Sequence, residues 1–345
     1  MTDNSRTAFA DRIDPVRAWS TRRTYRVADF RPDELVAAKA GRRISVVLPA
    51  RNEETTVGLI VEALRTELVI GVPLIDELVV VDSHSTDSTA AVAAGAGARV
   101  VAQGEILPAI GDIPGKGEAL WKSLAATDGD IVVFLDSDLR EFDTDFAVGL
   151  LGPLLTEPGV VFCKGAFDRP LDDGRTVLPA GGGRVTELVA RPLLATHWPA
   201  LTGFIQPLGG EYAGTRAALE SIPFAGAYGV DIGILIDLYE AYGLDALAQV
   251  DLGRRVHRNS PDSALSVMAM HQHLAVLERL RRHGRAAWGG GAGGGDGVGG
   301  GVGDDDEPGD TLTLHRRDAE TGEFVSESIR VAPGERPPMR EVRAR

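Results

Sequence analysis

Two carboxylates with a spacing suited to metal binding follow an apolar run: Asp136 and Asp138 come directly after 131–135, Ile-Val-Val-Phe-Leu. Such a run indicates a strand buried on both faces, as in parallel sheets, and residues two apart in an extended chain share one face. Because open α/β sheets bind ligands beyond the carboxyl ends of their strands, these oxygens suit Mg²⁺ or Mn²⁺ that holds a diphosphate. A polar turn uses the same residue types, so the motif alone leaves both interpretations open.

The loops after the first two expected strands carry groups that suit a nucleotide. Pro49 ends the first strand because proline donates no ladder hydrogen bond, and the backbone of 49–51 with the Glu53 carboxylate could bind a nucleobase and its ribose. The second strand ends before Ser83-His-Ser-Thr-Asp-Ser-Thr, whose small oxygen-bearing side chains suit contacts to a base. Both segments equally suit helix starts, with acids favoured by the helix dipole and hydroxyls as caps.

Two glycine-rich loops would offer backbone amides and a cation to an anion. Lys116 stands between Gly115 and Gly117 at an expected helix start, which suits contact with a diphosphate, although the Walker spacing is absent. The run 181–186, Gly-Gly-Gly-Arg-Val-Thr, opens another expected helix, where amides and Arg184 would receive a phosphate or carboxylate. A mobile surface turn is the alternative for each loop.

A basic cluster at 254–259 reads Arg-Arg-Val-His-Arg-Asn. The neutral imidazole of His257 could complete a metal site begun by Asp138, and the arginines would complement phosphate or carboxylate oxygens. A lone histidine is more often structural, so the residues alone leave its role open.

The elements that must position these groups alternate through the first half of the chain. Strands are expected at 44–49, 78–82, 99–102 and 131–135, and helices at 54–68, after 89 and at 117–126. This alternation predicts an α/β fold with a mostly parallel, helix-flanked sheet, whose right-handed crossovers bring the loops to one rim. In the less regular second half, strands are expected at 160–164 and 246–252, and helices at 184–194, 233–242 and 261–283.

Composition narrows the class of protein. The 345 residues, 43% of them hydrophobic, can bury a large core, and the net charge of −14 argues against a nucleic-acid partner. The polar start of the chain lacks the apolar core of a signal peptide, and no run approaches the roughly 18 apolar residues that cross a bilayer. Cys163 is the only cysteine, so a disulfide within the chain is excluded. A cytoplasmic protein with no membrane partner is expected.

The motifs in these loops, taken in their order along the chain, identify a protein family more specifically than any single motif does. They run through 46–54, 81–87, 114–121, 136–138, 181–194, 228–233 and 256–259. In this order the chain resembles the glucosyl-3-phosphoglycerate synthases of actinobacteria, retaining glycosyltransferases with a Rossmann-like GT-A fold. The resemblance covers about 40–285 and the terminal Arg-Pro-Pro-Met at 336–339. The run Gly-Gly-Gly-Arg-Val-Thr-Glu-Leu at 181–188 is what narrows it to this family.

The resemblance implies a donor, an acceptor, a metal and a site. The donor would be UDP-glucose, the acceptor D-3-phosphoglycerate, the metal Mg²⁺ or Mn²⁺, and the protein a homodimer. Donor-binding residues would be Pro49, Ala50, Arg51, Asn52, Glu53, Ser83, Lys116, Asp136, Ser137, Tyr228, Gly229, Val230, Asp231, Arg255 and Arg258. Acceptor-binding residues would be Gly183, Arg184, Val185, Thr186 and Asn259; metal ligands would be Asp138 and His257; Lys116 and Asp231 would act in catalysis.

The implied chemistry is attack by the 2-hydroxyl of phosphoglycerate on the anomeric carbon. The family is understood to attack from the face that the UDP leaves, with the departing phosphate taking the proton, so we assign no general base. The product would feed glucosylglycerate or methylglucose polysaccharide synthesis. One departure concerns Asp231, where the family usually has glutamate; the side chain is one methylene shorter, which could retract the carboxylate by roughly 1.5 Å.

The same reading divides the chain into five segments. They are an Arg-rich, irregular N-terminal arm (1–41), a nucleotide-sugar-binding half (42–160), a smaller acceptor-binding and metal-completing half (161–285), a flexible Gly/Asp-rich loop (286–310) and a C-terminal tail (311–345) that packs on the body or is partly disordered. The alternatives are a related transferase using GDP-mannose or a polyprenyl phosphate, and a non-catalytic nucleotide-sugar binder. A dinucleotide-binding dehydrogenase is disfavoured because no Gly-x-Gly-x-x-Gly follows the first strand.

Overall fold

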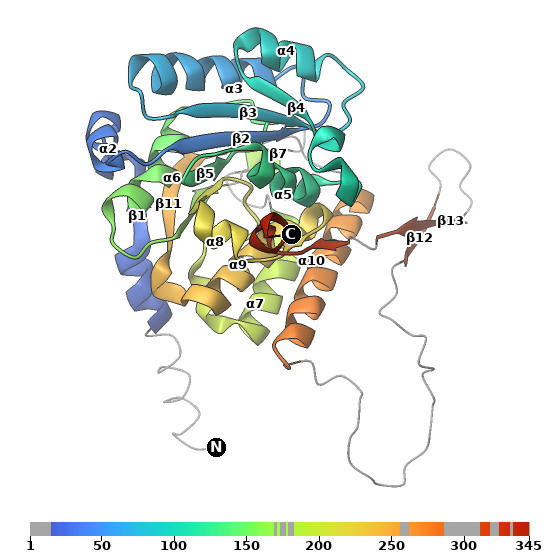
Figure 1. Cartoon of the computed structure of the whole chain (residues 1–345). Coiled ribbons are helices and arrows are strands. Elements are labelled where there is room, and N and C mark those ends of the chain that lie inside the picture. The colour runs from blue at the N-terminus through green and yellow to red at the C-terminus, as the bar shows by residue number, and fades with distance from the viewer. Residues whose placement is uncertain are drawn as a thin grey trace, which may run out of the picture.

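A twisted sheet with helices on both faces forms the body of the protein (Figure 1). The computed structural model describes residues 15–168, 171–172, 177–178, 183–255, 262–285, 311–317, 324–331 and 334–344. Within these residues the main sheet has eight strands in the order β1-β11-β6-β9-β5-β2-β3-β4. Its strands are β1 (Thr24–Arg26), β2 (Ile44–Ala50), β3 (Glu77–Asp82), β4 (Arg99–Ala102), β5 (Ile131–Phe134), β6 (Phe162–Asp168), β9 (Tyr212–Thr215) and β11 (Leu247–Arg254).

The helices and the smaller strand pairs complete the described architecture. The helices are α2 (Pro32–Lys39), α3 (Val57–Leu64), α4 (Thr89–Ala96), α5 (Lys116–Ala126), α6 (Asp145–Thr156), α7 (Arg191–His197), α8 (Arg216–Glu220), α9 (Val230–Tyr242), α10 (Asp262–Arg282) and α11 (Met339–Arg343). The pairs are β7 (Leu171–Asp172) with β8 (Val177–Leu178), β10 (Phe224–Ala225) with β14 (Glu335–Arg336), and β12 (Thr311–Arg317) with β13 (Phe324–Arg330).

The predicted parallel sheet is confirmed, with one exception in its middle. The strands β2, β3, β4 and β5 pair in parallel, as do β1, β11 and β6. Strand β9 lies between the two groups and runs antiparallel to both β5 and β6. It was not predicted, because its four residues, Tyr-Ala-Gly-Thr, give too short an apolar run to mark a strand.

Alternate side chains of the strands fill two separate cores. Val46 and Leu48 of β2 pack on the side of α3, α4 and α6, whereas Val47 of the same strand packs on the side of α5 and α9. Both faces are fully buried, which explains why the strands are continuous apolar runs rather than alternating ones. Each such side chain contributes roughly 1.5–3 kcal/mol on burial. The sheet therefore holds its rim loops on a rigid base.

Several boundaries differ from the predicted ones. Helix α9 begins at Val230 rather than 233, so Asp231 lies in its first turn and not in a loop. Helix α3 begins at Val57 rather than 54, and strand β6 covers Phe162–Asp168 rather than 160–164. The helix expected at 184–194 starts there, passes through a π-helical segment at Thr186–Ala190 and ends with α7. Helix α6 was not predicted.

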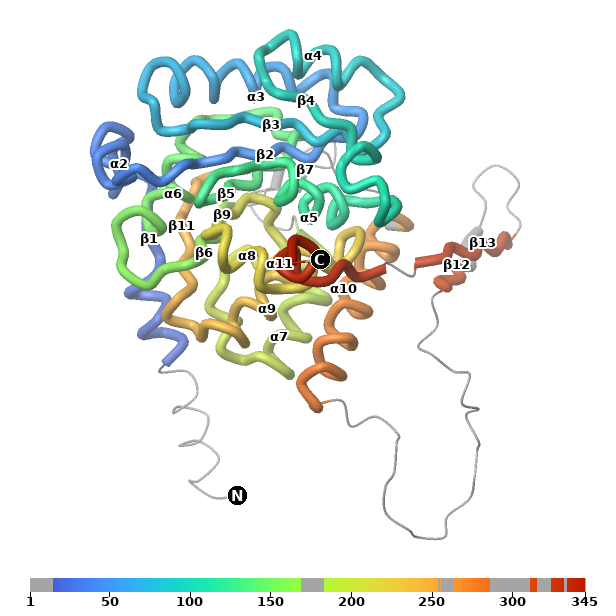
Figure 2. The backbone as a smooth tube through the Cα atoms, in the orientation of Figure 1, coloured from blue at the N-terminus to red at the C-terminus, as the bar shows by residue number. Residues whose placement is uncertain are grey.

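The prediction of an irregular arm at 1–41 is wrong for the residues that the structure describes, 15–41. Residues 15–23 are helical, and β1 pairs in parallel with β11 at the edge of the sheet, as Figure 2 shows for the blue strand beside the orange one. The indole of Trp19 is 1% exposed and donates to the carbonyl of Leu247 at 3.0 Å. Arginines dominate the composition here, but a few apolar anchors are enough to seat the segment.

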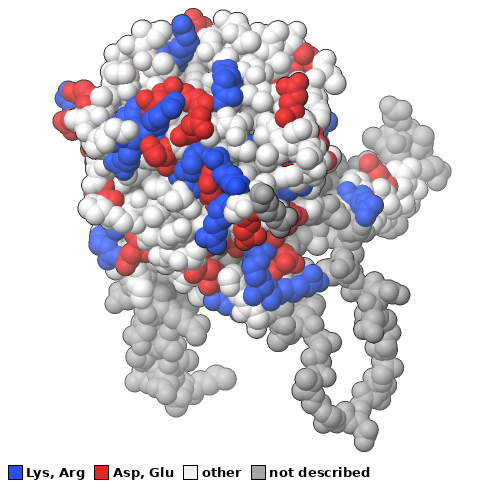
Figure 3. Space-filling view, in the orientation of Figure 1, with Lys and Arg blue, Asp and Glu red and all other residues white. Residues whose placement is uncertain are grey.

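The end of the chain packs on the body. Trp121 of α5 donates its indole N–H to the carbonyl of Pro337 at 2.7 Å, and Arg336 makes an ion pair with the buried Glu118. Figure 3 shows basic and acidic side chains interspersed on the face that carries this segment. Arg343 of α11 and Glu220 of α8 form one such pair, 3.3 Å apart. Of the two alternatives given for this tail, packing on the body describes 334–344.

The division at residue 160 into a donor half and an acceptor half stays a prediction about binding. Strands from both halves share the main sheet, because β9 lies between β5 and β6. The Gly/Asp-rich loop at 286–310 lies outside the described residues. Among the described helices, none has the length and apolar character needed to span a membrane.

Candidate active site

A cavity of about 720 Å³ opens where β2, β3 and β5 end. The start of α5 and the start of α9 form its floor, and α10 and the segment after β13 form its far wall. The predicted convergence of these loops on one rim is confirmed. Lining residues from the predicted set are Pro49, Ala50, Arg51, Glu53, Ser83, Lys116, Asp136, Ser137, Asp138, Gly183, Arg184, Val185, Thr186, Tyr228, Asp231 and Arg255.

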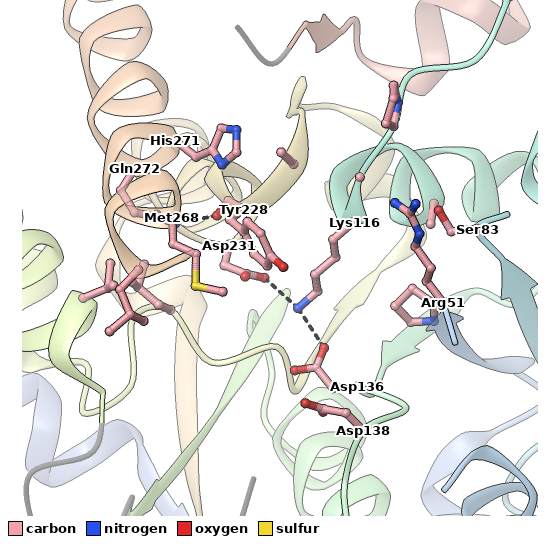
Figure 4. A pocket seen from close by; sticks show the side chains of 18 of the residues that line it. Arg51, Ser83, Lys116, Asp136, Asp138, Tyr228, Asp231, Met268, His271 and Gln272 are labelled. Atoms are coloured by element: carbon pink, nitrogen blue, oxygen red, sulfur yellow. Dashed lines mark hydrogen bonds and ion pairs between the residues drawn. The ribbon is translucent and has the colours of Figure 1, made fainter. Parts of the chain in front are cut away.

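Lys116 lies at the centre of the cavity between two carboxylates (Figure 4). Its Nζ is 2.8 Å from an oxygen of Asp136 and 3.4 Å from one of Asp231. Burial alone would lower the pKa of Lys116, but the charges of Asp136 and Asp231 outweigh it and raise that pKa above its usual value. The lysine therefore stays a cation at any working pH.

Arg255 connects the two aspartates of the first motif. One of its terminal nitrogens is 2.8 Å from Asp136 and 3.1 Å from Asp138, and the other is 3.1 Å from the buried Glu211. Burial disfavours the charged carboxylate of Asp136, yet Lys116 and Arg255 together hold its pKa well below the usual value. The guanidinium thus holds the carboxylates of Asp136 and Asp138 in position relative to each other.

Residues before β9 complete this arrangement and were missed by sequence reasoning. Glu211 is fully buried beneath Arg255. At Gly210, an added Cβ would lie 2.3 Å from an Asp136 oxygen and 2.4 Å from the Lys116 nitrogen, so only glycine leaves room for that ion pair. In the sequence these residues appear only as Gly-Gly-Glu at 209–211, and this tripeptide matches no motif that would have pointed to the site.

The two aspartates fit part of a divalent metal site. Their carboxylates already share one cationic group, Arg255, and the Asp138 side chain is 42% exposed, so it is open to a ligand from the cavity. Hard carboxylate oxygens are the ligands that Mg²⁺ and Mn²⁺ prefer. Within the part of the chain that the structure describes, no cluster of three or more metal-binding side chains occurs. The other predicted metal ligand beside Asp138, His257, lies outside that part, as do Arg258 and Asn259.

Of the predicted donor residues that the structure describes, three do not line the cavity. The backbone N–H of Asn52 donates to Ser85, and its side-chain oxygen accepts from the backbone of Thr86, so this side chain joins two loops. Gly229 is buried in the turn that leads into α9, and Val230 is buried as the first residue of that helix. Their predicted donor contacts stay predictions.

The opposite end of the cavity holds the glycine-arginine loop. Gly183 has a φ of +76°, a conformation that favours glycine, and Arg184 follows at the start of the helical segment. Thr186 is buried behind it. Met268, His271 and Gln272 of α10 face this end (Figure 4), and nothing in their sequence separated them from ordinary helix positions. Gln272 donates to the carbonyl of Tyr228, which ties α10 to the start of α9.

A family model and solved structures define the class of protein. The model for glycosyl transferase family 2 matches residues 45–180. A crystal structure of mannosyl-3-phosphoglycerate synthase from Rubrobacter xylanophilus superposes with a TM-score of 0.82 at 39% identity, covering 94% of this chain and 99% of that one. Together with the loops that suit a nucleotide and the pair Asp136 and Asp138, these matches define a glycosyltransferase of the GT-A fold, as the sequence predicted.

Closer comparison gives the family. The glucosyl-3-phosphoglycerate synthase of Mycolicibacterium smegmatis is 53% identical over 261 residues, which are 76% of this chain and 85% of that protein. The structure of the Mycobacterium tuberculosis enzyme of the same name, in complex with Mn²⁺, UDP and phosphoglyceric acid, has a TM-score of 0.76 at 43% identity and covers 91% of this chain and 95% of that one. The chain belongs to the glucosyl-3-phosphoglycerate synthase family.

Proposed function

We propose that this protein transfers glucose from UDP-glucose to the 2-hydroxyl of D-3-phosphoglycerate, giving glucosyl-3-phosphoglycerate and UDP, with Mg²⁺ or Mn²⁺. Relatives of this name share about half of their residues with it over most of their length, and solved ones hold either ion with UDP. One observation carries the proposal further: the loops that suit a nucleotide and the Gly183–Thr186 loop line the same cavity. Arg51 and Ser83 lie on the side away from α10 (Figure 4), whereas the Gly183–Thr186 loop leads into the segment Thr186–Ala190, which contacts α10. Donor and acceptor can therefore meet over Lys116.

The donor is proposed to lie along the rim with its diphosphate over Lys116. Asp138 with His257 would hold the metal, which supplies positive charge to the diphosphate. Lys116 neutralises the charge that grows on the departing phosphate, and its two carboxylate partners fix it there before the reaction begins. Asp231, in the first turn of α9, would face the glucose, where its shorter side chain still reaches the Lys116 nitrogen.

The acceptor is proposed to lie between the glucose and the glycine-arginine loop. Its phosphate or carboxylate would bind the amides at the start of the 184–190 helical segment and the guanidinium of Arg184. This grip brings the 2-hydroxyl close to the anomeric carbon on the face that the UDP leaves, so retention follows without a protein base. Asn259, which the resemblance adds to the acceptor-binding residues, lies outside the described part of the chain and stays a prediction.

Arg184→Ala is expected to raise the KM for D-3-phosphoglycerate by about 10- to 100-fold and to leave the KM for UDP-glucose near its original value. The physical reason is the loss of a charge-assisted hydrogen bond to the acceptor alone. Initial rates at varied acceptor and saturating donor measure this. Arg191→Ala is the matched control, because Arg191 follows in the same segment, pairs with Glu187 and does not line the cavity. Equal effects on both KM values would contradict the acceptor role.

A matrix of donors and acceptors tests the function itself. Product mass is read for UDP-glucose, GDP-glucose and GDP-mannose, each with and without D-3-phosphoglycerate and with Mn²⁺, Mg²⁺ or a chelator. We expect product only from UDP-glucose, phosphoglycerate and metal together. Equal UDP release without phosphoglycerate would sink the acceptor assignment. Efficient use of GDP-mannose would instead favour the specificity named for the Rubrobacter xylanophilus structure.

Three finer expectations from the sequence remain proposals. We propose a homodimer, a cytoplasmic location and a product that feeds glucosylglycerate or methylglucose polysaccharide synthesis. The β12–β13 hairpin lies away from the body in Figure 1, and the ring of Phe324 on it is 75% exposed. An exposed aromatic on a projecting hairpin supports the idea of a contact with a second chain.

A further inference from the structure

A chain of hydrogen bonds runs from the cavity into the body behind Ser83. The Ser83 hydroxyl is 2.8 Å from the side-chain oxygen of Gln103, which is fully buried. The side-chain nitrogen of Gln103 is 2.8 Å from Asp112 and 3.2 Å from the carbonyl of Ile113. None of the sequence motifs included Gln103 or Asp112.

The direction of every hydrogen bond in this chain is fixed by chemistry. A carboxylate and a backbone carbonyl only accept, so the side-chain nitrogen of Gln103 must face Asp112 and Ile113. Its oxygen then faces Ser83 and must accept the single hydroxyl proton of that residue. The Ser83 oxygen keeps its lone pairs and offers them to the cavity. Towards a bound ligand, Ser83 is therefore an acceptor and not a donor.

Asp112 is held in the ionised state that this direction requires. Its carboxylate accepts from Lys122 at 2.9 Å and is 2.6 Å from the His84 ring nitrogen. Burial would raise the pKa of Asp112, but hydrogen bonds from Lys122, Gln103 and His84 outweigh it and leave that pKa below its usual value. Lys122 is itself fully buried and donates to the backbone carbonyl of Gln103 as well.

Ser83 lies in the part of the cavity where the nucleobase of a bound nucleotide would fit. Lys116 and Asp138 lie between Ser83 and α10 in Figure 4, where a diphosphate and its metal would bind. Figure 4 shows Ser83 beside Arg51 on the side away from α10. The backbone N–H of Ser83 donates to Ala50 at 2.8 Å, so the ladder between the strand ends fixes its position.

We propose that Gln103 and Asp112 determine the choice of nucleobase by making Ser83 a hydrogen-bond acceptor. Such a serine accepts the ring N3–H of uracil, whereas cytosine presents a lone pair at the same ring position and is rejected. This inference rests on the proposed function, in which a nucleoside diphosphate sugar occupies the cavity. Gln103 and Asp112 are positioning residues, because they act on the ligand through Ser83.

The test compares the binding of UDP and of CDP, each with Mn²⁺, by calorimetry on the full chain. The wild type is expected to bind UDP at least about tenfold more tightly, since two acceptors that face each other in a buried site both lose a hydrogen bond. In Gln103→Met the hydroxyl of Ser83 is free to turn and donate, so the UDP:CDP ratio is expected to fall by about tenfold, mainly through tighter CDP binding. Asp112→Asn leaves the Ile113 carbonyl as the one group among these partners that can only accept from the Gln103 amide, so the ratio is expected to fall, but by less.

Gln249→Met is the matched control, since Gln249 is an equally buried glutamine that bonds Thr24 and the Gly203 carbonyl, away from the cavity. Its UDP:CDP ratio is expected to match the wild type. Equal affinity of the wild type for UDP and CDP, or an unchanged ratio in both Gln103→Met and Asp112→Asn, would overturn the proposal. The measurement needs neither acceptor nor turnover, so it fails independently of the glucosyl-transfer assay.

Discussion

Replacing Lys116 by methionine is expected to lower kcat by about 100- to 1,000-fold, the range typical of removing one preorganised group from a developing negative charge. Methionine keeps the length of the chain and removes only the charge that lies 2.8 Å from Asp136. The loss should appear in kcat more than in the KM for UDP-glucose, because the charge on the leaving phosphate grows in the transition state. Steady-state kinetics at saturating acceptor measure both constants.

The control for this variant is a second lysine in a similar ion pair far from the cavity. Lys39 lies 2.5 Å from Asp76 at the end of α2 and does not line the cavity. Lys39→Met is expected to lower Tm and to leave kcat near that of the wild type. A Lys116→Met enzyme that retains more than a tenth of the wild-type kcat would refute the assigned role.

The sequence was most informative at the ends of the strands. A doubly buried strand must be a continuous apolar run, and the polar residues that follow it mark the rim. Asp136 and the pair Asp82–Ser83 were therefore located from local pattern alone. The same reasoning placed Lys116 at a helix start, as the structure has it. Local pattern is sufficient here because each of these positions depends on the element directly beside it.

What the sequence did not show depends on contacts between distant segments. Arg255 reaches Asp136 across 119 positions, and Gly210 is required only because that ion pair lies against it. Asp231 looked like a loop residue because the spacing of apolar residues marks the middle of a helix better than its first turn. The bond between Ser83 and Gln103 likewise joins the end of β3 to the turn after β4.

Asp138→Ala is expected to reduce turnover by about a thousandfold or more, because a divalent metal contributes several kcal/mol to stabilising charge on a transferring group. Asp138 is suited to this role by exposure: 42% of its side chain is accessible, whereas Asp136 is engaged on both oxygens by Lys116 and Arg255. The variant should also bind Mn²⁺ more weakly in the presence of UDP, which water proton relaxation measures without turnover.

A neighbouring aspartate separates this effect from a change in the loop. Asp143 follows on the same loop, outside the cavity, and accepts from the backbone N–H of Asp145 at 2.9 Å where α6 begins. Asp143→Ala should cost about 1 kcal/mol of stability through the lost hydrogen bond to the Asp145 backbone and keep both Mn²⁺ affinity and turnover. If Asp138→Ala bound Mn²⁺ as tightly as the wild type, other residues would have to hold the metal. Asp136 would then be the first candidate ligand, because Arg255 holds its carboxylate next to that of Asp138.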